Sequence, residues 1–152
     1  MSKTIHLTHT YPYSAASVWQ VATDLDHLRR VTSGKITFRN LPSGSIFEGQ
    51  MLEVDVSLFG LLPYQPYRME VRQFDAKAMR FVSSEIGAGV KSWEHTLHVI
   101  DHSDHCQIKE HIKIDAGILT PAFCLWAKYL YRSRHLPRLA ILKELSGAKR
   151  PA

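Results

Sequence analysis

His95 and Glu110 lie on neighbouring segments of the sequence. Their side chains, an imidazole and a carboxylate, can act together as a catalytic or binding pair. Residues 91–101 and 104–115 both alternate polar and apolar side chains, which predicts two β-strands. If the two-residue turn His102-Ser103 joins them, the hairpin register places His95 opposite Glu110. An imidazole held beside a carboxylate can transfer protons or orient a polar group of a ligand.

The same register pairs Asp101 with Asp104, and three apolar pairs then share the side of the ladder that holds His95 and Glu110. Because side chains repeat every second residue, these pairs are Trp93 with Ile112, Leu97 with Ile108 and Val99 with Cys106. The other side receives the charged or polar Glu94, His98, Lys109 and Lys113, and we expect it to face water. The predicted inner face therefore holds one polar pair among apolar neighbours.

Three roles stay open for this pair. It could anchor a ligand hydroxyl, carbonyl or carboxylate, or it could serve as acid and base in a reaction. It could also be an internal ion pair or hydrogen bond that only joins the two strands.

The rest of the chain predicts the elements that position this pair. Residues 3–11 alternate like a strand, Ser14 is a candidate N-cap for a helix, and Asp24 or Asp26 is a candidate cap for a short second helix. From residue 35 onward, alternation with short connections predicts six strands in an antiparallel meander. Pro121 then opens a long amphipathic helix, which is the natural cover for the apolar face of the sheet.

Periodicity at 100° per residue assigns two faces to the last helix. The predicted apolar face holds Ala122, Leu125, Trp126, Tyr129, Leu130, Leu136 and Ala140. The predicted solvated face holds Lys128, Arg132, Arg134, His135 and Arg138. Pro137 should kink or restart the helix, because proline lacks the N–H donor and clashes with the preceding turn. We expect one domain over residues 1–146 and a frayed tail over 147–152.

Composition excludes several classes of protein. The chain has 152 residues, of which 45% are hydrophobic and 22% charged, which is typical of one folded domain rather than a disordered segment. No apolar run approaches the roughly 18–20 residues of a membrane span, and residues 1–10 lack the apolar block of a signal peptide, so we expect a cytoplasmic protein. The net charge is +5, and the basic residues are denser only from Lys128 to Arg150, where we expect them to form the solvated face of the last helix rather than to contact nucleic acid.

Motifs for metals and cofactors are also absent from the sequence. The two cysteines lack C-x-x-C spacing, and we expect both to be reduced. The pairs His6 with His9 and His95 with His98 are three apart on predicted strands, so their rings point to opposite faces and no metal site is expected. No phosphate-binding loop is present, and no cofactor is expected.

Two stretches give the chain a family resemblance. Residues 13–26 (YSAASVWQVATDLD) are similar to the opening helix of the SRPBCC (START-related, helix-grip) superfamily, in which a Val-Trp pair is followed by Thr-Asp and a second helix. Residues 131–139 (YRSRHLPRL) resemble the C-terminal helix of its polyketide cyclase/dehydrase-like branch. The resemblance implies an α+β helix-grip fold, with a curved seven-stranded antiparallel sheet around a long C-terminal helix and two short helices between strands 1 and 2. It also implies an apolar cavity beneath that helix, because members bind lipids, sterols, polyketides or quinones.

These expectations combine into one functional hypothesis, the binding of a hydrophobic small molecule between the sheet and the last helix. The candidate ligand-binding residues are Val54, Val56, Tyr67, Met69, Phe81, Trp93, His95, Leu97, Glu110, Ile112, Trp126 and Leu130. One alternative is a cyclase or dehydratase that uses His95 and Glu110 in the same cavity. Another is a module that contacts proteins or membranes.

The apolar loop 59–64 bears on that last alternative. Its Phe59, Leu61 and Leu62 are candidates for a contact with a membrane or a second subunit, or for a lid over the cavity. The loop could equally fold back onto the last helix.

Overall fold

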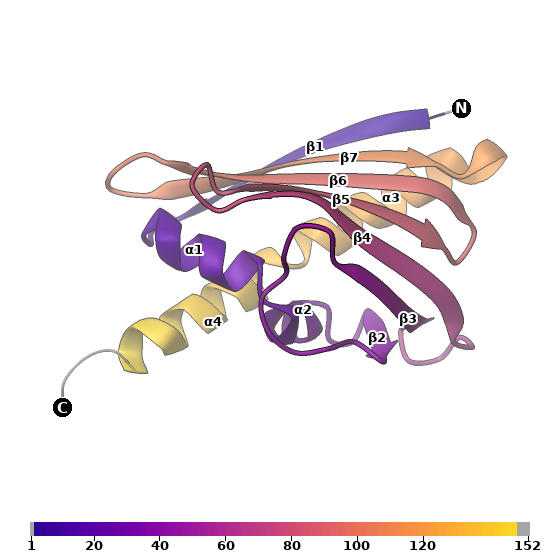
Figure 1. The fold of residues 1–152 in the computed structure, drawn as a ribbon, viewed down its shortest axis with the longest axis horizontal. Helices are drawn as coiled ribbons and strands as arrows, with labels where there is room; N and C mark the ends of the chain where they lie inside the picture. Colours follow the sequence, from indigo (N-terminus) through magenta and orange to yellow (C-terminus); the bar gives the residue numbers. More distant parts are fainter. Residues whose placement is uncertain (1, 149–152) are drawn as a thin grey trace.

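The computed structural model describes residues 2–148 of the chain (Figure 1). Its elements are β1 (Ser2–Tyr11), α1 (Ala15–Ala22), α2 (Leu25–Val31), β2 (Ile36–Arg39), β3 (Met51–Leu58), β4 (Gln65–Asp75), β5 (Arg80–Gly87), β6 (Val90–Asp101), β7 (Cys106–Asp115), the short 3-10 helix η1 (Gly117–Leu119), α3 (Thr120–Arg132) and α4 (His135–Ala148).

The strands form one antiparallel sheet in the order β1-β7-β6-β5-β4-β3-β2. Successive strands are neighbours except for β1, which pairs with β7 and so brings the two ends of the sheet-forming sequence together. The helices lie along one face of the curved sheet, as Figure 1 shows. The predicted helix-grip architecture, with seven strands and two short helices after the first strand, is confirmed.

Both short helices begin at the residues that the sequence indicates. The Ser14 hydroxyl accepts a hydrogen bond from the backbone N–H of Ser17, and the Asp24 carboxylate accepts one from the N–H of Asp26. Each cap satisfies a backbone donor that the first helical turn leaves without a partner. Asp24, rather than Asp26, caps the second helix.

The β6–β7 hairpin has a different register from the predicted one. Asp101 pairs with Cys106 rather than with Asp104, so residues 102–105 form a four-residue loop. A two-residue loop of type I′ needs positive φ at both central positions, which His102 and Ser103 do not favour. In the longer loop Ser103 alone has a positive φ, and its N–H donates to the Asp101 carboxylate. Because the register shifts by two residues, every side chain stays on its predicted face.

The C-terminal helical segment breaks between α3 and α4, at Ser133 and Arg134, three residues before Pro137. The predicted restart near Pro137 is therefore confirmed. Its predicted faces are wrong in part: Leu130 is buried and Lys128 and Arg132 are exposed as predicted, but Leu125, Tyr129 and Leu136 are 70%, 50% and 74% exposed. The buried stripe follows residues at spacings of three and four: Thr120, Cys124, Ala127, Tyr131, Arg134, Arg138 and Ile141. Hydrophobicity alone selects the wrong side, since this stripe includes a threonine and two arginines.

None of the helices formed by residues 2–148 is both long and apolar enough to cross a membrane. Cys106 and Cys124 are buried and form no disulfide. Helix α4 continues to Ala148, two residues beyond the predicted domain end at 146, and the remainder of the predicted tail, 149–152, lies outside the described residues.

Candidate functional site: a cavity between the sheet and the helices

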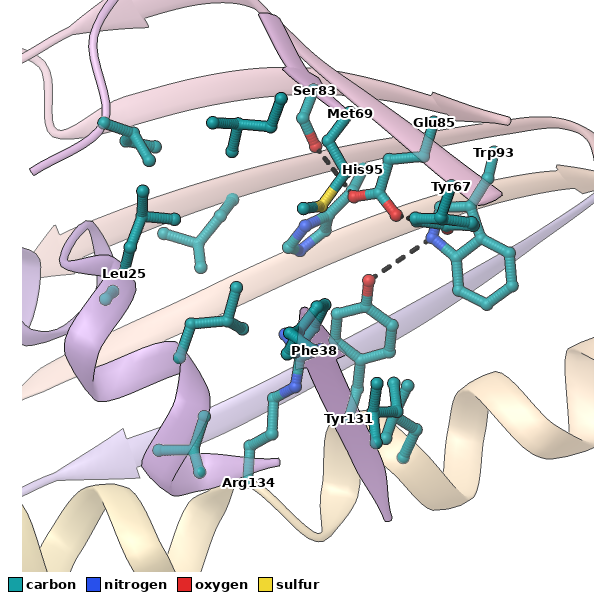
Figure 2. A pocket seen from close by; sticks show the side chains of 18 of the residues that line it. Leu25, Phe38, Tyr67, Met69, Ser83, Glu85, Trp93, His95, Tyr131 and Arg134 are labelled. Carbon is teal, nitrogen blue, oxygen red and sulfur yellow. Dashed lines mark hydrogen bonds between the residues drawn. The ribbon is translucent and has the colours of Figure 1, made fainter. Parts of the chain in front are cut away.

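A cavity of about 160 Å³ lies between the inner face of β3–β6, helix α2 and the junction of α3 with α4 (Figure 2). Its wall is mostly apolar, with Phe81 and Leu97 from the sheet, Leu28 from α2 and Trp126 from α3. Ligand pockets usually measure about 300–1,000 Å³, so this cavity is small. Helix α3 packs on β1 and β7, and Leu25 of α2 packs on β3, so the cavity lies between these two contacts.

Nine of the twelve candidate residues line this cavity: Val56, Tyr67, Met69, Phe81, Trp93, His95, Leu97, Trp126 and Leu130. Val54, Glu110 and Ile112 do not. Val54 lies directly opposite Tyr67 in the β3–β4 ladder, and the larger Tyr67 side chain lines the cavity there. Ile112 packs in the core cluster under α3, and Glu110 lies fully buried behind His95.

The His95–Glu110 pair forms as a buried contact. Nε2 of His95 lies 2.6 Å from Oε2 of Glu110, and the two side chains are 5% and 0% exposed. In the observed register they are diagonal neighbours, because Glu110 is opposite Leu97 and His95 is opposite Ile112. The ring of His95 also packs against Phe81 and Tyr131, which holds the imidazole in one orientation.

Electrostatics keep the Glu110 carboxylate ionised. Burial opposes its charge, but the His95 hydrogen bond and the positive charges of His95, Arg138 and Arg134 lower the pKa of Glu110 to about 2. Its second oxygen, Oε1, has no hydrogen-bond partner among the described residues. Because Glu110 accepts from Nε2 of His95, the other ring nitrogen, Nδ1, is the one available to a ligand in the cavity.

A second polar group on the cavity wall was not predicted. The Tyr67 hydroxyl donates to Glu85 at 2.6 Å, and the Ser83 hydroxyl donates to the same carboxylate at 3.3 Å (Figure 2). Burial and the neighbouring Glu85 charge raise the pKa of Tyr67 well above its usual value, so the phenol keeps its proton. Period-two alternation from Phe81 would have indicated Ser83 and Glu85.

Two arginines predicted to be solvated instead reach the cavity. Arg134 and Arg138 are 9% and 4% exposed, and both line it. Arg138 donates to the Tyr11 hydroxyl at 3.1 Å, while the Arg134 guanidinium lies over the Tyr131 ring at 4.2 Å. Tyr131 itself accepts from the indole N–H of Trp93 at 3.3 Å. The signal that could have found these arginines is their helical spacing of three and seven residues from Tyr131.

The apolar loop between β3 and β4 partly folds back onto the helices. The Phe59 ring packs edge-on against Trp126 of α3, with ring centroids 5.3 Å apart. Leu61 and Leu62 remain exposed, at 86% and 53%. Trp126 therefore lines the cavity and contacts this loop as well.

No group of three or more histidine, cysteine, aspartate or glutamate side chains is placed to hold a metal ion within residues 2–148.

Comparisons with known proteins identify the fold. The family described as "Domain of unknown function (DUF8410)" matches residues 12–141. No curated protein matches the sequence.

Solved structures with the same fold come from several organisms. A norcoclaurine synthase mutant from Thalictrum flavum, in complex with a transition-state analogue, is 20% identical, with 96% of this chain and 97% of that chain covered and a TM-score of 0.69. The protein Ara h 8.0201 is 12% identical (95% and 99% covered, TM-score 0.74), and a START superfamily protein from Mycobacterium smegmatis is 9% identical (93% and 98% covered, TM-score 0.70). The fold is thus the SRPBCC, or Bet v 1-like, helix-grip fold, as the sequence resemblance implied.

Proposed function

The chain belongs to the DUF8410 family, and from this premise and the geometry of its cavity we propose that it binds a hydrophobic small molecule between the sheet and the helices. The observation that carries the proposal is the mostly apolar cavity with a few polar groups on its wall, which is the usual composition of small-molecule sites. A cavity that served packing alone would be filled, because protein interiors are close-packed. Structural neighbours with the same fold include a synthase captured with a transition-state analogue.

His95 acts in this proposal as a polar anchor for the ligand. Because Glu110 accepts at Nε2, a neutral His95 presents Nδ1 as an acceptor for a ligand hydroxyl. A charged His95 presents Nδ1–H as a donor for a carbonyl or carboxylate. The same pair could transfer protons, as a polyketide cyclase or dehydratase would require, and a ligand recovered from the protein in altered chemical form would support that second role.

Ligand binding is testable with the neutral fluorescent probe N-phenyl-1-naphthylamine. We expect the wild-type protein to bind the probe, and Ser83→Phe to lower the affinity roughly tenfold or more, because Ser83 lines the cavity. Ser84→Phe is the matched control, since the neighbouring residue points to the other face of β5. Near-UV circular dichroism checks that both variants fold.

The proposal fails if the wild-type protein does not bind the probe, or if both phenylalanine variants bind as the wild type does. The variant His95→Ala then tests whether His95 itself holds the ligand, because it removes the imidazole and leaves the apolar wall of the cavity in place. Native mass spectrometry should show a co-purifying ligand on the wild type and its loss from a folded His95→Ala protein.

A second candidate function, contact with an anionic membrane surface, is favoured by the exposed apolar side of α3. Leu125 and Tyr129 lie on this side, and Ile118 of η1 and the loop residues Leu61 and Leu62 are also exposed. We define these five residues as the apolar patch. Trp126 connects its two parts, because its ring contacts both Phe59 and Tyr129. Exposed apolar surface of this extent marks interaction sites.

Charge argues for an anionic lipid surface as the occupant of the apolar patch. No acidic residue occurs between Asp115 and Glu144, while the exposed Lys128 and Arg132 lie on α3. Amphipathic helices with apolar and basic residues on their outer side lie in the membrane interface, and each basic residue near anionic lipid contributes about 1 kcal/mol.

Co-sedimentation with lipid vesicles tests this second candidate. We expect binding to phosphatidylcholine vesicles that contain phosphatidylglycerol, little binding to pure phosphatidylcholine, and weaker binding as salt increases. Leu61→Ser and Leu125→Ser should each reduce binding severalfold, whereas Phe47→Ser, an exposed residue outside the apolar patch, should not. Equal binding by all three variants would contradict membrane contact. A wild-type dimer in gel filtration that Leu125→Ser dissociates would instead assign the apolar patch to a second copy of the chain.

A further inference from the structure

Arg134 is a buried cation without an anionic partner. Its side chain is 9% exposed, and no carboxylate of residues 2–148 lies within ion-pair distance of its guanidinium. Its Nε atom is fully buried and has no hydrogen-bond partner among those residues. Figure 2 shows Arg134 extending from the helices toward the sheet, beside Tyr131, and it lines the cavity.

The acidic groups nearest to the cavity are already engaged. Glu110 accepts from His95 at 2.6 Å through Oε2, Glu85 accepts from Tyr67 and Ser83, and Asp24 accepts from the backbone N–H of Asp26 at the start of α2. Arg134 therefore keeps its charge in a partly apolar site, where its guanidinium lies over the face of Tyr131 and interacts with Glu110 only through space, without an ion pair. A guanidinium does not lose its proton in proteins, so it cannot escape this cost by becoming neutral.

A buried charge without a partner destabilises a fold, and such groups persist where they bind something. We propose that Arg134 binds the acid group of an amphipathic organic acid whose hydrocarbon part fills the cavity. A carboxylate matches the planar fork of the guanidinium, which can donate two parallel hydrogen bonds to it. This inference rests on the proposed ligand-binding function and adds the chemical class of the ligand.

The remaining polar groups fit the same ligand. Arg138 of α4, four residues after Arg134, adds positive charge at the cavity and donates a hydrogen bond to the Tyr11 hydroxyl. Leu28 from α2 and Phe81 and Leu97 from the sheet supply apolar surface for the hydrocarbon part. The ligand then has one charged end at the helix junction and an uncharged body.

Two probes that differ by one sulfonate test this inference. 1-Anilinonaphthalene-8-sulfonate is the sulfonated form of N-phenyl-1-naphthylamine, so their affinity ratio reports the contribution of the anionic group. We expect the wild-type protein to bind the anionic probe roughly tenfold more tightly than the neutral probe, and Arg134→Met to bring the ratio of the two affinities close to one. Arg132→Met, an exposed position two residues earlier, should keep the preference.

Decanoate and 1-decanol provide the same comparison as competitors. Decanoate should displace N-phenyl-1-naphthylamine from the wild type more effectively than 1-decanol does, and Arg134→Met should make the two equal. Absence of neutral-probe binding would refute the proposed function itself. Neutral-probe binding with no preference for the anionic probe, or a preference that survives Arg134→Met, would overturn only the role of Arg134.

Thermal stability separates a binding role from a structural one. If Arg134 lacks an anion in the free protein, Arg134→Met should raise the melting temperature without ligand, because the buried charge is replaced by an apolar side chain of similar length. Decanoate should then stabilise the wild type but not the variant. A lower melting temperature for ligand-free Arg134→Met would show that the arginine is already paired within the fold and would overturn the inference.

Discussion

At the scale of single residues, Glu110 shows how a buried carboxylate is kept charged. It is fully buried, and its hydrogen bond to His95 together with the nearby arginine charges outweighs the cost of burial. Removing one member of such a pair leaves the other without compensation, which costs more than the pair itself contributes. The His95–Glu110 pair is therefore expected to matter for stability as well as for ligand orientation.

Glu110→Gln should lower the free energy of unfolding at neutral pH, on the order of 3 kcal/mol. The pKa of Glu110 is lowered in the folded state, from an ordinary 4.5 to about 2. Its ionised form thus contributes stability that is fully present above about pH 4.5 and is lost as the pH falls toward 2. Urea unfolding at pH 7, 5 and 3.5 should show the difference between wild type and variant decreasing at the lowest pH.

Glu94→Gln serves as the control for this measurement, because Glu94 is exposed on the opposite face of β6. A difference between wild type and Glu110→Gln that stays constant from pH 5 to pH 3.5 would contradict the assignment of the lowered pKa to Glu110.

At the scale of elements, α4 is docked against β1 through two histidines. The rings of His9 on β1 and His135 at the start of α4 stack with centroids 4.9 Å apart. Burial lowers the pKa of both, and for His9 the charges of His135, Arg138 and Arg132 lower it further, while that of Glu110 opposes this effect. Both rings are thus favoured in the neutral form.

We expect acidification to weaken this contact. Because the folded-state pKa values lie below the ordinary 6.5, the neutral rings contribute stability above about pH 6.5, and this stability decreases as the pH falls below it. His135→Gln should therefore lose less melting temperature than the wild type between pH 7.5 and pH 5.5. His102→Gln, in the β6–β7 loop, is the control and should lose as much as the wild type. Equal losses for His135→Gln and wild type would show that this stacked pair does not carry the effect.

At the scale of the whole molecule, the fold places the cavity beside the apolar patch. The sheet lies on one side, the helices cover its inner face, and α3 turns one side to the sheet and the other outward (Figure 1). Trp126 separates the cavity from the contact with the β3–β4 loop. The proposed ligand cavity and the apolar patch thus both adjoin Trp126.

Much of the local structure followed from the sequence. Alternation identified the strands, and the side-chain oxygens of Ser14 and Asp24 marked the two helix starts. The placement of His95 and Glu110 on one buried face was correct although the predicted register was off by two residues. Side chains of a strand alternate between its two faces, so a register error of two residues leaves each side chain on the same face. The prediction that His95 and Glu110 share a face was therefore unaffected by the register error.

Only the tertiary structure decided which side of α3 and α4 meets the sheet, how much space remains there, and that Arg134 lies in it. Leu125, Tyr129 and Leu136 have helical spacing but are exposed, whereas Arg134 and Arg138 are buried. Local sequence determines that a segment is helical and where it stops, because capping, proline and periodicity act over a few residues. The rotation of a helix about its own axis and the volume left beneath it depend on all the surfaces that pack together. These contacts form only in the folded chain, so a local stretch of sequence does not determine them.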